Sequence, residues 1–103
     1  MDTKDISLRI ATLRTKKKVS AREMSLAIGQ NANYINHIET GNAVPSLSGL
    51  MYICEYLDIT MKEFFDFESD NPAQLNKITE HLKKLNDEQL ETVEKLVKNL
   101  AEK

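Results

Sequence analysis

The chain has 103 residues and a formal net charge of −2, so it holds one small domain or one domain with an appendage, and its overall charge does not indicate nucleic-acid binding. A single cysteine, Cys54, cannot form an internal disulfide, which indicates a reducing cytoplasm. No apolar run is long enough to cross a membrane or to act as a signal peptide, and the low glycine and proline content favours an all-α protein.

The charge is distributed unevenly. Residues 1–45 hold seven Lys or Arg against four Asp or Glu, whereas residues 46–70 hold one Lys against six acids. The N-terminal part is therefore the basic one.

Helix signals begin early in this basic part. A first helix is predicted over 5–16. Its apolar positions, spaced by three and four residues, form the inward stripe Ile6, Ile10 and Leu13. Ser20 and Glu23 form an S-x-x-E capping box that starts a second helix over 21–28, and Gly29 ends it.

The third predicted helix begins after Asn31, a good N-cap, and ends near Thr40 at Gly41. Asn is a mediocre helix former, yet four lie in or beside this short segment. Polar side chains at i, i+3, i+4 and i+7 share one face, which consists of Asn33, Asn36, His37 and Thr40. Ile35 and Ile38 mark the other side as the buried one.

Two further helices complete an N-terminal domain over residues 1–69. Ser46 caps a fourth helix, whose core stripe is Leu50, Ile53, Cys54 and Leu57. Thr60 and Glu63 form a capping box for a short fifth helix over 61–66. The acidic segment "DFESDN" after it is expected to be a linker.

Residues 70–103 predict two amphipathic helices. The first starts with Pro72 and runs to about Leu85, and a capping box of Asn86 and Gln89 starts the second. Their apolar residues form two heptad seams: Leu75, Ile78, Leu82 and Leu85, then Leu90, Val93, Val97 and Leu100. Because two such short helices are marginal alone, we expect a helical hairpin that forms a four-helix bundle with a second copy. Packing on the chain's own domain, or on a different protein, is the alternative.

The second and third helices, joined across Gly29, predict a helix-turn-helix. Ser25 supplies the small residue that the motif needs four positions before the glycine. In this motif the second helix enters the major groove and presents its outer face to base edges. Asn can bond adenine through a donor and an acceptor, so the polar face of the third helix is predicted to contact bases.

The segment "VSAREMSLAIGQNANYINHIETGNAVPSLSGLMYICEYLDITMKEFF" resembles the phage-repressor-like, or XRE, helix-turn-helix family, and the resemblance extends over about residues 6–67. The matching features are Arg14, Ser20, Glu23, Gly29, Tyr34-Ile35, Ile38-Glu39, Gly41, Pro45-Ser46-Leu47 and the closing "ITMKEFF". The resemblance implies a five-helix, lambda-repressor-like DNA-binding domain, usually that of a dimeric transcriptional repressor.

The resemblance also implies roles for single residues. The base-reading positions are Ala32, Asn33, Asn36 and His37. The positions near phosphates are Ala21, Tyr34 and Asn42, to which we add Lys17, Lys18, Arg22 and Thr40. Arg14 and Glu39 match an ion pair that ties the first helix to the end of the third.

These features predict a sequence-specific regulator that binds double-stranded DNA, a cytoplasmic repressor of bacterial or phage origin that occludes a promoter as a homodimer. The alternative is an antitoxin-like or adaptor protein that keeps the fold and binds a protein partner through its acidic surfaces. The negative net charge and the small Ala32 leave that alternative open. His37, His81 and Cys54 lack metal-ligand spacing, and no nucleophile with a base or phosphate-binding glycine loop occurs, so we expect no enzyme, metal, cofactor or small-molecule ligand.

Overall fold

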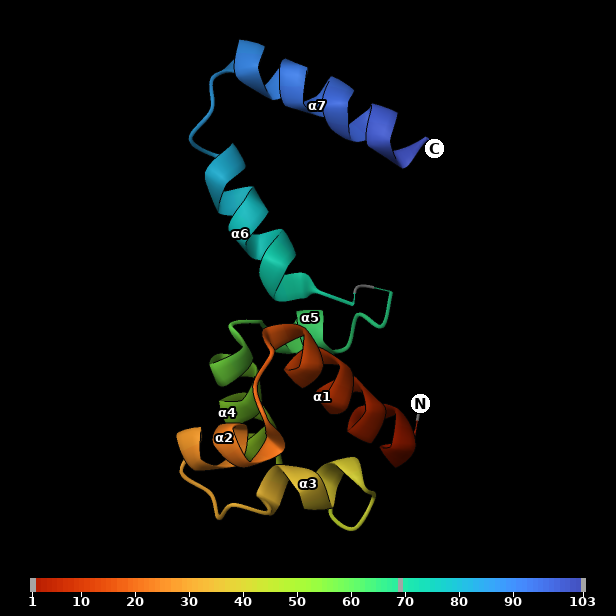
Figure 1. The fold of residues 1–103 in the computed structure, drawn as a ribbon, viewed down its shortest axis with the longest axis vertical. Coiled ribbons are helices and arrows are strands. Elements are labelled where there is room, and N and C mark those ends of the chain that lie inside the picture. The colour runs from red at the N-terminus through yellow and green to blue at the C-terminus, as the bar shows by residue number, and fades with distance from the viewer. Residues whose placement is uncertain (1, 69, 103) are drawn as a thin grey trace. The chain divides into compact units, whose positions relative to one another are not determined.

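Seven helices and no strands make up the part of the chain that the structure, a computed structural model, describes: residues 2–68 and 70–102 (Figure 1). In chain order they are α1 (Thr3–Lys17), α2 (Ala21–Ala27), α3 (Tyr34–Glu39), α4 (Leu47–Leu57), α5 (Met61–Phe64), α6 (Pro72–Leu82) and α7 (Asp87–Ala101). The predicted all-α class is confirmed. Within the described ranges, no helix has the length and apolar character needed to span a bilayer.

The chain divides into two units, Met1–Ala73 and Gln74–Lys103. The predicted boundary lay between residues 69 and 70. Pro72, in the first turn of α6, is buried, so the start of this helix belongs to the first unit. Ser69, which falls in the predicted linker, lies outside the described residues.

One apolar core holds the first unit together. α1 packs against α3 and α4, α2 packs against α3, and α4 packs against α5. The buried apolar side chains are Ile10, Leu13, Met24, Ile35, Ile38, Leu50, Ile53, Cys54, Leu57 and Phe64. All five helices of this unit therefore contribute to the core, and α3 does so through both of its isoleucines.

α1 begins two residues earlier than predicted because Asp2 caps it. The Asp2 carboxylate accepts the backbone N–H groups of Lys4 at 2.9 Å and of Asp5 at 3.2 Å, and the Asp5 carboxylate accepts the N–H of Asp2 at 2.9 Å. Two aspartates thus form the reciprocal bonds of a capping box, which an S-x-x-E pattern does not detect.

The two helices around Gly29 are shorter than predicted. α2 ends at Ala27, and α3 begins at Tyr34 rather than directly after Asn31. The Asn31 side chain accepts the N–H of Asn33 at 3.0 Å, so it stabilises a turn over residues 32–33 instead of capping the helix itself. The residues that lead into α3 therefore lie on a turn.

Two later helices also end early. α5 stops at Phe64 rather than at 66, and Arg9 donates to the carbonyls of Glu63, Phe64 and Asp66 at this end. α6 stops at Leu82 rather than at Leu85, and the N–H of Leu85 bonds to the Leu82 carbonyl three residues back at 3.1 Å. Such a tightened last turn is a common helix ending.

The second unit contains two amphipathic helices with uncovered apolar faces. The Asn86–Gln89 capping box forms both of its bonds and starts α7. The seam positions that remain more than a third exposed are Leu75, Ile78, Leu90, Val97 and Leu100, and Leu96 beside them is 58 % exposed. The other three seam positions, Leu82, Leu85 and Val93, are half-buried.

Candidate nucleic-acid interface

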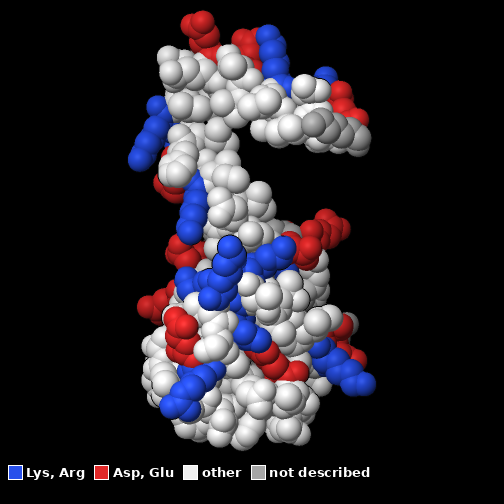
Figure 2. Space-filling view, in the orientation of Figure 1, with Lys and Arg blue, Asp and Glu red and all other residues white. Residues whose placement is uncertain are grey.

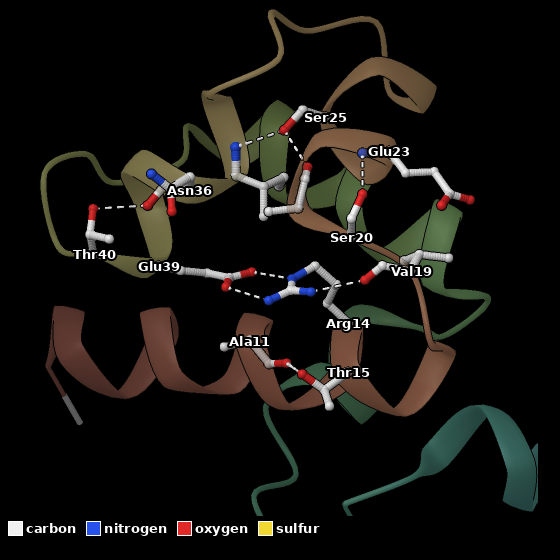
Figure 3. Close-up of polar contacts among 12 residues, drawn as sticks. Ala11, Arg14, Thr15, Val19, Ser20, Glu23, Ser25, Asn36, Glu39 and Thr40 are labelled. Carbon is white, nitrogen blue, oxygen red and sulfur yellow. Dashed lines mark hydrogen bonds and ion pairs between the residues drawn. The ribbon is translucent and has the colours of Figure 1, made fainter.

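Ser25 fastens α2 to α3 at the centre of the helix-turn-helix. Its side chain is fully buried; the hydroxyl donates to the Ala21 carbonyl at 2.7 Å and accepts the backbone N–H of Ile35 at 3.0 Å (Figure 3). The N–H groups of a helix's first turn have no partner inside the helix, so this bond satisfies one of them for α3. A small residue was predicted here; the hydroxyl adds a direct bond between the two helices.

The turn between the helices depends on a left-handed residue. Gly29 has φ +79°, a conformation that costs an L-residue with a side chain strain but costs glycine none. The N–H of Gln30 then bonds to the Ser25 carbonyl at 2.9 Å and closes the end of α2.

One side of the α3 region is open to solvent and polar. Ile35 and Ile38 are fully buried, whereas the exposed positions are Asn33, Asn36, His37 and Thr40. Ala32 is half-buried on the preceding turn. In Figure 2 the end of the first unit where Figure 1 labels α3 is mostly white. α3 contains no Lys or Arg, and its one acid, Glu39, is mostly covered. This surface offers carboxamide, imidazole and hydroxyl groups rather than charge.

Internal hydrogen bonds hold the loop after α3. The Thr40 hydroxyl donates to the Asn36 carbonyl at 2.8 Å and accepts from Asn42 Nδ2 at 3.0 Å. The backbone N–H of Asn42 also bonds to the His37 carbonyl at 2.8 Å. Thr40 and Asn42 are therefore oriented by each other before any ligand arrives.

Arg14 joins α1 to α3 and to the start of α2. Its Nε and Nη2 donate to the two carboxylate oxygens of Glu39 at 2.7 and 2.9 Å, and Nη1 donates to the Val19 carbonyl at 2.9 Å (Figure 3). The side chains of Arg14 and Glu39 are 20 % and 13 % exposed. The hydrogen bonds to Glu39 raise the pKa of Arg14, so the guanidinium stays charged.

The comparison with known families covers this same region. Residues 9–70 match the Cro/C1-type HTH DNA-binding domain, which is more than half of the chain. The chain belongs to this family. Neither the curated proteins nor the solved structures contained a significant match. The Cro/C1-type domain binds DNA, and the resemblance to the XRE helix-turn-helix family expected from the sequence is confirmed.

A buried arginine, Arg9, joins α1 to the end of α5 in the Cro/C1-type domain. Its role was not predicted from the sequence. Arg9 is 4 % exposed; its Nε donates to the Phe64 carbonyl at 2.7 Å, and its Nη2 donates to the carbonyls of Glu63 at 2.8 Å and Asp66 at 2.9 Å. Desolvation lowers the pKa of Arg9, and the nearby Asp66 and Asp70 oppose that effect. Helical spacing could have indicated this residue, since Arg9 lies three residues after Ile6 and directly before Ile10.

The basic residues of the Cro/C1-type domain do not all share one environment. The Lys17 ammonium lies 5.1 Å from the centroid of the Tyr56 ring on α4, in cation–π contact. Lys18 ends α1 in the left-handed conformation and is exposed, as is Arg22 on α2. Lys18 and Arg22 are therefore more available to an anion than Lys17.

Neither a catalytic family nor a metal centre was found. The matched family is a DNA-binding one. Among residues 2–68 and 70–102, no three His, Cys, Asp or Glu side chains are grouped so that they could hold a metal ion.

Proposed function

We propose that this Cro/C1-type protein is a sequence-specific transcriptional regulator, and specifically a dimeric repressor that occludes promoter DNA in the cytoplasm of a bacterium. The observation that supports it best is the exposed polar side of α3, which is backed by two fully buried isoleucines and by the Ser25 bond. A rigid helix of this kind holds its outward side chains in register for base edges in the major groove.

In this proposal, side chains of the α3 region read bases. Asn33 and Asn36 carry both a donor and an acceptor, which suits the N6 and N7 atoms of adenine, and neutral His37 offers one of each. Ala32 contributes only a methyl group, which suits contact with the methyl group of thymine.

A second set of residues holds the DNA backbone in this proposal. Its members are Lys17, Lys18, Ala21, Arg22, Tyr34, Thr40 and Asn42. Contacts to phosphate give affinity without reading sequence, and those made by Lys or Arg release counterions and weaken with salt. Lys17 would first have to leave the Tyr56 ring.

The partner subunit is proposed to bind through the uncovered seams of α6 and α7. Leu75, Ile78 and Leu82 on α6 and the whole second seam on α7 keep heptad spacing, whereas Leu85 lies beyond the end of α6. Two copies of each helix would bury these side chains in a four-helix bundle. A two-fold axis through that bundle would relate two copies of α3, so that each copy could contact one of two DNA half-sites.

Selection of bound duplexes from a random pool, followed by a gel shift with competitor DNA at low and moderate salt, tests the proposal. We expect one enriched site with two related half-sites and retention against competitor. Binding that is equally weak for every duplex would contradict sequence-specific regulation. No binding at either salt would favour the adaptor alternative, in which the fold serves a protein partner.

A further inference from the structure

Gly49 occupies an unusual position inside α4. It is buried in the first turn of the helix, and its backbone is not in the left-handed region that only glycine adopts easily. Glycine is among the poorest helix formers, so neither helix propensity nor backbone conformation explains it. What a glycine supplies at such a position is space.

The Tyr34 hydroxyl fills that space. A Cβ atom on Gly49 would lie 2.5 Å from the Tyr34 hydroxyl oxygen and 3.1 Å from the Ser46 hydroxyl oxygen. Contacts of 2.5 Å do not occur for real Cβ atoms, so any other residue at 49 would force the tyrosine or the helix to move. The Tyr34 Cζ atom would be 3.8 Å away, which is an ordinary contact, so the hydroxyl is the only atom of the tyrosine that clashes, and the Ser46 hydroxyl would have to give by a few tenths of an ångström.

The Tyr34 hydroxyl has little freedom to move aside. Tyr34 is the first residue of α3, and its ring packs against the buried core. A tyrosine side chain has two rotatable bonds before its rigid ring, so the hydroxyl can shift only if the ring leaves its packing. Burial also raises the pKa of Tyr34 above its ordinary value, which already keeps a tyrosine hydroxyl protonated at neutral pH.

We propose that Gly49 is a positioning residue for DNA binding: the space it leaves in the first turn of α4 seats the hydroxyl of Tyr34, the first residue of α3, for donation to a DNA phosphate. This rests on the proposed function, in which Tyr34 contacts the DNA backbone. Gly49 itself touches no DNA, and its effect passes through the tyrosine.

Three variants of the full chain test this: Gly49→Ala, Tyr34→Phe and the double variant, with affinity for the selected duplex measured by fluorescence anisotropy. We expect each single variant to bind about tenfold more weakly, the loss of one hydrogen bond to a charged group. We expect the double variant to bind as Tyr34→Phe does, because no hydroxyl is left to displace. Losses that multiply in the double variant would overturn the proposal.

Phosphate ethylation interference gives a readout that a purely structural role would not change. Gly49→Ala and Tyr34→Phe should both lose interference at the same phosphate and keep it at the others. The matched control is Tyr52→Phe, which removes a hydroxyl from an exposed tyrosine on α4 and should leave affinity and interference unchanged. A Gly49→Ala variant with wild-type affinity and an intact interference pattern would overturn the inference and leave DNA binding intact.

Thermal melting covers the case in which Gly49→Ala folds poorly. Its melting temperature should fall in the presence of Tyr34 and should recover most of that loss in the Tyr34→Phe background, where the closer oxygen is gone and only the Ser46 contact remains tight. Failure of Tyr34→Phe to restore stability would also overturn the inference. If the wild-type protein binds no duplex at all, the proposed function fails first and this inference fails with it.

Discussion

Arg14 and Glu39 meet through two parallel hydrogen bonds, so the pair is fixed in geometry as well as in charge. The same guanidinium bonds the Val19 carbonyl, and one side chain thereby joins α1, the start of α2 and the end of α3. The pair therefore adds a polar link between the helix-turn-helix and α1, which the apolar core also joins.

Breaking the Arg14–Glu39 pair should destabilise the domain. We expect Arg14→Met and Glu39→Gln each to lower the free energy of unfolding by about 2 kcal/mol, between the values for exposed and for buried pairs, because both side chains are mostly but not fully covered. Chemical denaturation of both single variants and the double variant measures the coupling. Strictly additive losses would show that the two side chains do not act as a pair.

Removing Arg9 should cost more than removing an exposed cation from the same helix. Arg9→Met removes the guanidinium that donates to three backbone carbonyls, and Arg9→Lys cannot reproduce the planar fork of a guanidinium. We expect both variants to lose about 3 kcal/mol of unfolding free energy. Lys4→Met, an exposed change on α1, is the control and should stay within about 0.5 kcal/mol of wild type. Equal effects at positions 4 and 9 would contradict the assigned role of Arg9.

The order and type of the helices could be predicted because their signals are local. Capping residues and apolar spacing depend only on neighbours in the chain, so the predicted starts at Ala21, Met61 and Asp87 are confirmed. The start of α1 was predicted two residues late because an aspartate pair replaced the usual capping box.

The contacts that could not be predicted link residues distant in sequence. Arg9 meets Phe64 across more than fifty positions, and Gly49 makes room for Tyr34 on another helix. The residues within four positions of Arg9 or of Gly49 do not indicate which distant residue either one will contact. The Arg14–Glu39 pair was found only through the family resemblance, since spacing alone gives no pairing between separate helices.

Mutations of base-reading residues and of phosphate-contacting residues should have different effects on DNA binding. We expect Asn36→Ala to cost roughly 1–3 kcal/mol of binding free energy for the preferred site and to relax the preference at one adenine. Lys18→Ala should weaken binding to every duplex alike and reduce the salt dependence, while Lys17→Ala, whose ammonium rests on Tyr56, should do so less. Repeating the selection with each variant measures both effects. An unchanged preference in Asn36→Ala would exclude it as a base reader.

Cys54 should be protected from alkylation in the folded protein. Its buried thiol should also make the free energy of unfolding fall at high pH. The side chain is 2 % exposed, and burial raises the pKa of its thiol from 9.0 to about 11. Since the folded state keeps the proton longer, the stability from the buried thiol is fully present below pH 9 and is lost as the pH rises through about 11. We therefore expect the stability difference between wild type and Cys54→Ala to shrink over that interval. Iodoacetamide should react at neutral pH only after denaturant is added; rapid labelling of the folded protein would contradict the burial.

The C-terminal unit should supply the dimer. We expect the full chain to sediment as a dimer, and residues 1–73, which contain their own core, to remain folded as a monomer with weak, salt-sensitive DNA binding. The cut follows Ala73 because Pro72 is buried. Two linked domains can read half-sites about 10 base pairs apart, which a single recognition helix cannot do, so truncation should remove most affinity for the selected site.

A charge placed in each seam should reproduce that truncation. Leu82→Asp with Val97→Asp puts one carboxylate into each apolar stripe, where two copies would have to bury it unpaired. Thr92→Asp with Asn99→Asp adds the same total charge at exposed polar positions of α7 and is the matched control. We expect the seam variant to sediment as a monomer with the DNA affinity of residues 1–73, and the control to remain a dimer with wild-type affinity. If the wild-type chain sediments as a monomer, or residues 1–73 alone dimerise and bind as tightly, the seams have no part in DNA binding and the two-fold axis lies elsewhere.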